Sequence, residues 1–138
     1  MQYSPIIRAA RLADIMAQIG SGARLLLFIS AKSADCTSAD PQGLIATMTL
    51  PAVWLATPVI SGNLVTVSIA NGPWATTTTG SGTVLSFRIY NSALTVCGLQ
   101  GTVSTVVDGT GDMLLTSNAL GGGQLINIAS FTITSGNA

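Results

Sequence analysis

The sequence contains no histidine and no glutamate, and charged residues make up only 7% of its 138 positions. Without an imidazole, the Ser–His, Cys–His and histidine–metal arrangements of catalysis are excluded. Paired-carboxylate chemistry would fall to the aspartates, which all lie in segments typical of helices and turns. We therefore expect that the chain is not an enzyme, and no group of residues points to a cofactor or a bound metal.

Long apolar runs and clusters of basic residues are also missing. The longest apolar run, residues 25–29, is far shorter than the roughly 18 residues that a membrane-spanning helix needs. Five scattered basic residues are balanced by five acidic ones, whereas binding to a nucleic-acid backbone requires clustered lysine and arginine. The N-terminus lacks the continuous apolar block of a secretory signal. We expect synthesis in the cytoplasm and neither a membrane nor a nucleic acid as partner.

The two cysteines, Cys36 and Cys97, fit no metal-binding spacing. In a cytoplasmic protein, two such residues are ordinarily free thiols. A disulfide requires that the two segments are neighbours in the fold and that the mature protein meets oxidising surroundings. Both interpretations remain open from the sequence.

What the sequence has in abundance is apolar and small neutral residues. Hydrophobic residues make up 48% of the chain, whereas its 7% of charged residues compares with a usual share of about 25%. A length of 138 residues suits one core. Since a soluble monomer normally maintains a charged surface, much of this exterior must be neutral or covered by partners.

The first residues predict a single helix. Ser4 is a suitable N-cap, Pro5 fits the first helical position, and Gly20 is a natural end. An apolar stripe recurs at three- and four-residue steps through Ile6, Ala9, Leu12, Ala13, Met16 and Ile19. Arg8 and Arg11 lie mostly off this stripe and are expected to face solvent. Whether the stripe packs on the same chain or on a neighbouring subunit remains open.

After residue 22 the sequence turns to β-branched residues, glycine, serine and threonine, with turn signals about every ten residues. This rhythm predicts an all-β domain, an antiparallel β-sandwich of about eight strands with a jelly-roll-like layout. We divide the chain into an N-terminal helix or anchor, 1–21, and a β-sandwich domain, 22–138. The expected strands are 24–30, 44–50, 64–70, 83–91, 94–97, 101–107, 113–117 and 125–134.

Alternation within two strands predicts which side chains face the core. In 83–91, Leu85, Phe87 and Ile89 are expected inside, with polar residues such as Arg88 outside. In 125–134 the apolar face changes partway, which predicts a β-bulge near Ala129 or Ser130.

Three polar segments, 31–43, 71–82 and 121–123, are predicted to be loops. The connection 51–58 contains Trp54, whose indole is expected to cap the core, although contact with a neighbour is the alternative. Trp74 lies in a turn-rich segment and is expected to be the more exposed of the two tryptophans.

Asp108 and Asp112 flank two glycines and could form part of a calcium loop. A calcium site requires six or more oxygen ligands, and no third carboxylate lies nearby. Since Asp-Gly between strands is typical of a hairpin, we predict a hairpin turn here.

Motifs along nearly the whole chain resemble a family of small virion proteins of tailed bacteriophages. The residues that support the resemblance are Met1-Gln2-Tyr3-Ser4, Arg8, Arg11-Leu12 and Gly20, then Cys36, Asp40 and Gly43, then Leu50-Pro51 and Trp54, then Phe87-Arg88-Ile89-Tyr90, Cys97, Gln100-Gly101-Thr102-Val103, Gly111-Asp112-Met113, Gly123-Gln124 and Phe131-Thr132. The segment 91–96 departs from the family, where a glycine turn is more typical.

The resemblance implies a virion protein, first of all a capsid decoration (cement) protein that stabilises the outer shell by protein–protein contacts. Its partners would be the major capsid protein or other virion proteins, and copies of itself, with a trimer favoured. A tail or head-fibre component docked through the N-terminal helix is the alternative. A third hypothesis is a carbohydrate-binding module that uses Trp74 and Tyr90. The candidate interaction residues are Ile6, Arg8, Arg11, Leu12, Ile15, Trp54 and Trp74.

Overall fold

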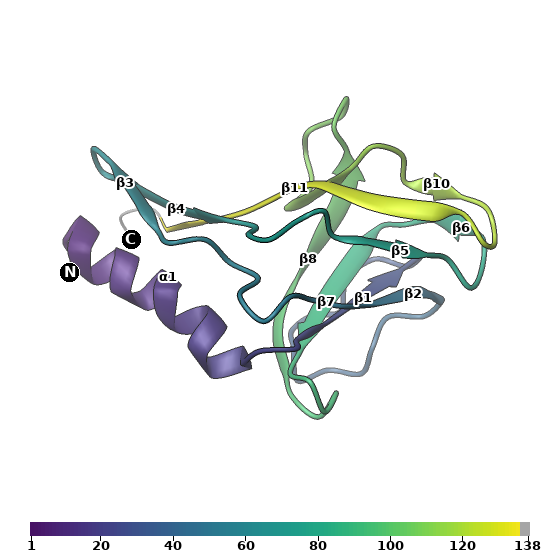
Figure 1. Cartoon of the computed structure of the whole chain (residues 1–138), viewed down its shortest axis with the longest axis horizontal. Helices are drawn as coiled ribbons and strands as arrows, with labels where there is room; N and C mark the ends of the chain where they lie inside the picture. The colour runs from purple at the N-terminus through teal and green to yellow at the C-terminus, as the bar shows by residue number, and fades with distance from the viewer. Residues whose placement is uncertain (136–138) are drawn as a thin grey trace.

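The computed structural model describes residues 1–135 as a mostly β structure with one N-terminal helix (Figure 1). The elements are α1 (Pro5–Ile19), β1 (Arg24–Phe28), β2 (Leu44–Thr49), β3 (Val59–Ser61), β4 (Leu64–Ser68), β5 (Ala75–Thr77), β6 (Gly82–Thr83), β7 (Ser86–Tyr90), β8 (Cys97–Thr105), β9 (Met113–Leu115), β10 (Ala119–Leu120) and β11 (Leu125–Ser135).

The strands form one large mixed sheet and one small sheet. The large sheet runs in the order β2-β1-β7-β8-β9-β11-β4-β3, with β5 also paired to β11, and β10 pairs with β6. Every pairing among the described strands is antiparallel except that of β8 with β9, which is parallel. The expectation of an antiparallel layout throughout is therefore wrong at this one pair.

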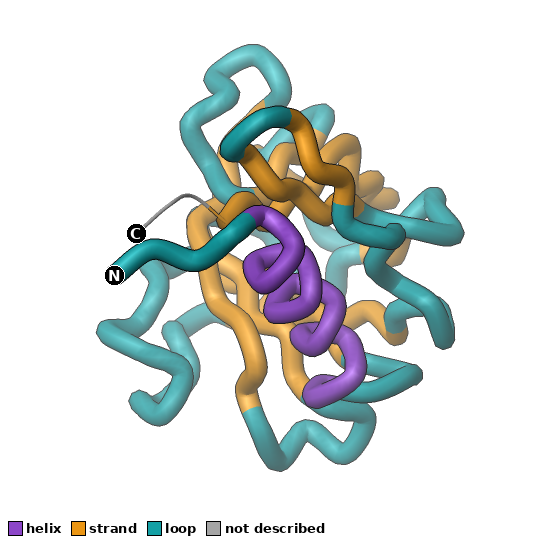
Figure 2. The backbone as a smooth tube through the Cα atoms, turned by 90° about the vertical axis from the view of Figure 1, so that its left-hand side faces the viewer, coloured by secondary structure: helices purple, strands orange, loops and turns teal. Residues whose placement is uncertain are grey.

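The helix has the predicted ends and packs on its own chain. The Ser4 hydroxyl accepts a hydrogen bond from the Ile7 N–H, Pro5 is the first helical residue, and Gly20 ends the helix with a positive φ of 92°. Leu12 is buried in the core. Four more helix residues pack against that core: Ala9, Ile15, Met16 and Ile19. Figure 2 shows the helix lying across one end of the strands.

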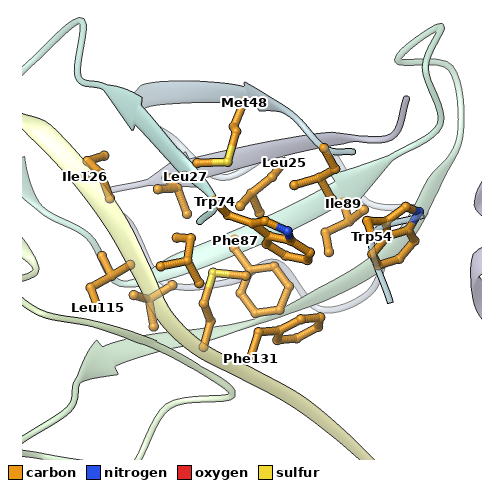
Figure 3. Packing of buried hydrophobic residues seen from close by; sticks show 14 of the residues in the cluster. Leu25, Leu27, Met48, Trp54, Trp74, Phe87, Ile89, Leu115, Ile126 and Phe131 are labelled. Carbon is orange, nitrogen blue, oxygen red and sulfur yellow. The ribbon is translucent and has the colours of Figure 1, made fainter. Parts of the chain in front are cut away.

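The centre of the core is a chain of aromatic side chains that links distant strands (Figure 3). The ring of Phe131 on β11 lies 5.4 Å from Phe87 on β7 and 6.2 Å from Trp74, and Trp74 lies 6.3 Å from Trp54. The core thus fills the space between the β1–β7–β8 part and the β5–β11–β4 part of the sheet.

Trp74 is 1% exposed, so the expectation of an exposed Trp74 is wrong. Its indole N–H donates to the Ala70 carbonyl at 3.2 Å, which satisfies the polar atom in an apolar site. Trp54 is also fully buried, and its indole N–H donates to the Gly20 carbonyl at 3.2 Å. Core capping was the correct interpretation of Trp54.

Strand β7 is buried on both faces, which the alternation did not predict. Phe87 and Ile89 are in the core as expected, but Leu85 is 43% exposed, and Ser86 and Arg88 are buried. The reason is that the 31–43 loop covers the second face of this central strand: Arg88 donates to carbonyls of the loop, and the Ser86 hydroxyl donates to the Ser30 carbonyl just before it.

Several boundaries differ from those predicted. The short strand β5 lies within the predicted loop 71–82, and β6 lies where this loop meets the next predicted strand, whereas β3 and β10 lie in stretches to which no element was assigned. Residues 94–96 form a turn instead of a strand. In that turn the Asn91 side-chain oxygen accepts from the Thr95 and Val96 N–H groups, and Leu94 has a φ of 59°. The predicted bulge in the last strand is confirmed, since the register shifts between Ile128 and Ser130.

The predicted hairpin at residues 108–112 is wrong, because the strands on its two sides run parallel. The chain turns back after β8, and the Asp112 carboxylate accepts hydrogen bonds from the Thr102 N–H at 2.8 Å and the Thr102 hydroxyl at 2.9 Å. This attachment returns the chain to the level of Thr102, from which β9 follows β8 in the same direction, with Val103 opposite Met113.

Candidate interaction surface

The N-terminal half of α1 is attached to the sheet through a buried arginine. The Arg8 Nη1 donates to the Asn63 carbonyl, in the turn between β3 and β4, at 2.7 Å and to the Ser135 carbonyl at the end of β11 at 2.8 Å. Arg8 is only 2% exposed, so the expectation that it faces solvent is wrong. Its long side chain crosses from the helix to the β3–β4 turn and to the end of β11.

The Arg8 guanidinium is incompletely bonded. Among residues 1–135, its Nε and Nη2 atoms are buried and have no hydrogen-bond partner, and no carboxylate pairs with it. A buried cation without a carboxylate is costly because it loses hydration without a compensating ion pair.

Exposed apolar side chains gather around the same end of the molecule. They come from the start of the chain and from the β3–β4 hairpin, which the Arg8 hydrogen bond joins and which lie together in Figure 2. We call this set the apolar end: Tyr3, Ile6, Ile7, Val59, Ile60 and Leu64, with exposed fractions between 41% and 73%. A grouping of this kind is typical of surfaces that bind another protein.

Of these residues only Ile6 was among the candidates from sequence. The β3–β4 hairpin had a signal that could have predicted it, since Gly62-Asn63 stands between two short apolar runs. Gly62 has the positive φ, 58°, that such a two-residue turn requires.

The remaining candidates divide between surface and interior. Arg11 is exposed and its guanidinium lies 4.9 Å from the centre of the Tyr3 ring. Ile15 is half-buried and lines a groove of about 410 Å³ between α1 and the start of β8. Leu12, Trp54 and Trp74 are buried within this chain, so they offer no surface to a partner.

A second polar cluster forms where the 31–43 loop covers β7. Arg88, which is 1% exposed, donates five hydrogen bonds, among them one at 2.8 Å that forms an ion pair with Asp40. The other four acceptors are the Ser38 and Asp35 carbonyls, the Tyr90 hydroxyl and the Gln100 side-chain oxygen. Asp40, Arg88 and Gln100 belong to separate sequence motifs, and the fold brings their side chains into contact here.

Contacts with the 31–43 loop shift the pKa values of ionisable groups in this cluster. Burial, and then the hydrogen bond that the Tyr90 hydroxyl donates to Asp40, raises the pKa of Tyr90 above its usual value. Hydrogen bonds from the Thr37 hydroxyl and then from the Ser38 N–H lower the pKa of Asp35 from 3.8 to about 2. Asp35 thereby stabilises the turn at the tip of the loop.

The Asp108–Asp112 segment uses its carboxylates within the chain. Asp112 binds Thr102, as described above, and Asp108 accepts a hydrogen bond from the Thr110 hydroxyl at 2.6 Å. Within residues 1–135 no three potential metal-ligating side chains come together. No helix in the part of the chain that the structure describes has the length and apolarity to span a membrane.

Comparison with known proteins gives no relative: no family model, no curated protein and no solved structure matches the chain.

Proposed function

We propose that this chain is a structural protein of a tailed-bacteriophage particle, a capsid decoration protein that stabilises the shell by contacts with neighbouring proteins. Its function would be binding and not catalysis. It would be incorporated into the particle after synthesis in the host cytoplasm. The proposal rests on the resemblance of its sequence motifs and on the nature of its surface.

The observation that most supports it is the apolar end. In a chain with only 7% charged residues, this end exposes six apolar side chains near the attachment of α1 to the β3–β4 hairpin. Contact with a neighbouring protein would remove this apolar area from water, at about 25 cal/mol per Å². We propose that the shell of the particle covers this end.

The proposed architecture is a β-sandwich, jelly-roll-like and antiparallel except at the β8–β9 pair, whose two layers are the parts of the sheet that face each other across the aromatic core. A sandwich presents its strand edges and hairpins at its ends, and the apolar end is such a place. Copies of the chain would assemble as a homo-oligomer, with a trimer favoured, around a symmetry axis of the shell.

The burial of Trp74 removes the main candidate residue of the carbohydrate-binding alternative. A sugar platform requires an exposed aromatic ring, whereas Trp74 is buried and the hydroxyl of its partner candidate, Tyr90, is bonded to Asp40.

The proposed function is tested by the copy number of the chain in purified particles of the phage that encodes it, measured by mass spectrometry against the major capsid protein. Decoration of the shell predicts hundreds of copies per particle. A number in the tens or fewer would instead place the chain in the tail or a head fibre, and absence from the particle would contradict a virion role altogether.

A further inference from the structure

The 31–43 loop is fixed on both sides of Cys36. Arg88 on β7 donates through Nη2 to the Asp35 carbonyl at 2.8 Å and through Nη1 to the Ser38 carbonyl at 2.9 Å. Gln100 on β8 donates to the Ser33 carbonyl at 2.9 Å. These bonds hold the segment that contains Cys36 over β7 and the beginning of β8.

Cys97 begins β8 on the same side of the molecule. Its register partner on β7 is Tyr90, whose hydroxyl bonds to Asp40 of the loop. Both cysteines are half-buried, and both line one hollow of about 440 Å³ with Thr37, Asp40 and Tyr90. The fold thus brings two thiols that are far apart in the sequence to the same wall of the protein.

The Cys36 thiol also acts on Cys97. Burial, and then the nearby Cys36 thiol, raises the pKa of Cys97 to about 12. The thiol form of Cys97 is therefore dominant at neutral pH, and Cys97 is expected to be a slow nucleophile there.

We propose that Cys36 and Cys97 are a redox pair that closes to an intramolecular disulfide and so attaches the 31–43 loop covalently to β8. In the reducing cytoplasm the pair would stay as thiols, and it would close once the protein meets oxidising surroundings outside the cell. The inference stands apart from the virion role, since it depends only on the loop and β8.

The oxidant is a small-molecule disulfide such as oxidised glutathione. The Cys36 thiolate attacks one of its sulfurs, which forms a mixed disulfide and releases one glutathione thiolate. Cys97 loses its proton to solvent and attacks the Cys36 sulfur, which releases the second glutathione. The protein loses two protons and two electrons, and with them one glutathione disulfide becomes two glutathione molecules. Since Cys97 holds its proton tightly, the second step is expected to be slow and to accelerate as pH rises.

Mass spectrometry of the full chain tests the proposal. The protein is reduced, freed of reductant, incubated with oxidised glutathione at pH 8, alkylated and denatured, and we expect a product lighter than the reduced chain by two hydrogens that resists alkylation. Trypsin cleaves after Lys32 and Arg88, so Cys36 lies in peptide 33–88 and Cys97 in peptide 89–138. The disulfide would join these two peptides, and reduction would separate them.

The melting temperature gives a second measurement. A disulfide between Cys36 and Cys97 closes a long loop and so reduces the conformational freedom of the unfolded chain. The oxidised form is therefore expected to melt about 5–15 °C higher than the reduced form. Cys36→Ser and Cys97→Ser are the matched controls, and neither should show a shift with oxidant. The same oxidation in concentrated urea measures closure by the unfolded chain, and we expect its equilibrium constant to be at least about tenfold smaller.

Two results would overturn the inference. One is the accumulation of chains with glutathione on both cysteines and no joined peptide in the native protein. The other is a closure constant that is equal in the native and the urea-unfolded chain, because the fold would then contribute nothing to the pairing. Neither result bears on the copy number in the particle, so the two proposals fail separately.

Discussion

The regions around the two buried arginines differ in how completely their polar groups are bonded. Arg88 lies under the 31–43 loop, pairs with Asp40 and donates five hydrogen bonds. Arg8 lies between α1 and the β3–β4 hairpin, donates only two, and has no carboxylate partner among the described residues. Within residues 1–135, Arg8 has two buried donor atoms without a partner, whereas Arg88 has one, its Nε.

At the Arg88 region the chain itself supplies hydrogen-bond partners for most of the guanidinium. At the Arg8 region the described residues leave more of the guanidinium without partners. The Arg88 region acts as an internal support, which fixes a polar loop on a central strand. The Arg8 region lies beside the exposed apolar side chains of the apolar end, and such a grouping is typical of a protein surface that is covered in an assembly. The predictions below test this contrast, from the largest expected effect to the smallest.

Replacing Arg88 should cost the most stability. Arg88→Ala removes the donor for five acceptors and leaves the 31–43 loop without its main attachment. We expect the free energy of unfolding to fall by about 3–5 kcal/mol, measured by urea denaturation. Arg11→Ala, at an exposed arginine in contact with the Tyr3 ring, is the control and should change it by less than about 1 kcal/mol. Equal losses in the two variants would contradict the support assigned to Arg88.

Replacing Arg8 should cost less, and the kind of replacement should matter. Arg8→Ala leaves the Asn63 and Ser135 carbonyls without donors, and we expect a loss of about 2 kcal/mol. Arg8→Met keeps the apolar length of the side chain and removes an unpaired buried charge, so its loss should be smaller. At Arg88, by contrast, methionine should be nearly as harmful as alanine. If Arg8→Met destabilises as much as Arg88→Met, the two regions do not differ as described.

Charges placed on the apolar end should weaken assembly without unfolding the chain. Ile6 lies in the first turn of α1, where an aspartate is favourable, and Val59 lies on the edge strand β3, where a lysine is well tolerated. We expect the double variant Ile6→Asp, Val59→Lys to bind particles that lack the chain at least about tenfold more weakly, which corresponds to about 1.4 kcal/mol.

Val107→Asp is the matched control for this variant. Val107 is an apolar residue that is 96% exposed in the loop after β8, away from the apolar end. It should bind particles like the wild type, and all three proteins should have the same melting temperature within about 2 °C. Equal weakening by Val107→Asp would show a general effect of charge and not a defined surface.

The smallest effect is expected in acid. The folded chain lowers the pKa of Asp35 to about 2 from 3.8, so the stability that this carboxylate provides is complete above pH 4 and is lost as pH falls through about 2. Stability should therefore decline from pH 4 to pH 2, and the decline should be shallower in Asp35→Asn. Between pH 5 and 7 it should be nearly constant, because the chain has no histidine. A side-chain carboxyl shift that titrates near pH 4 in the folded protein would contradict the role of the loop hydrogen bonds.

Local signals predicted much of the fold. The N-cap, the first-turn proline and the terminal glycine gave the helix, and the change of apolar face gave the bulge near Ser130, because each of these depends on neighbouring residues only. The parallel pairing of β8 with β9 could not be predicted, since it depends on the hydrogen bonds between Asp112 and Thr102.

The candidate surface was harder to predict than the strands. Whether an aromatic or an arginine side chain is buried depends on what covers it in three dimensions. Trp74 lies in a polar, turn-rich segment and yet reaches the core, and Arg8 lies on the polar side of the helix and yet reaches the β3–β4 turn and the end of β11. To predict the apolar end, one would have to know that the β3–β4 hairpin lies beside the first turns of α1.

The most direct test of the account compares hydrogen–deuterium exchange of the free chain with that of the chain in purified particles. We expect residues 1–8 and 59–64 to exchange more slowly in the particle, while the 31–43 loop exchanges at the same rate in both. Unchanged exchange at 59–64, together with protection of the 31–43 loop, would show that the particle covers the region that the chain completes by itself, and would contradict the account.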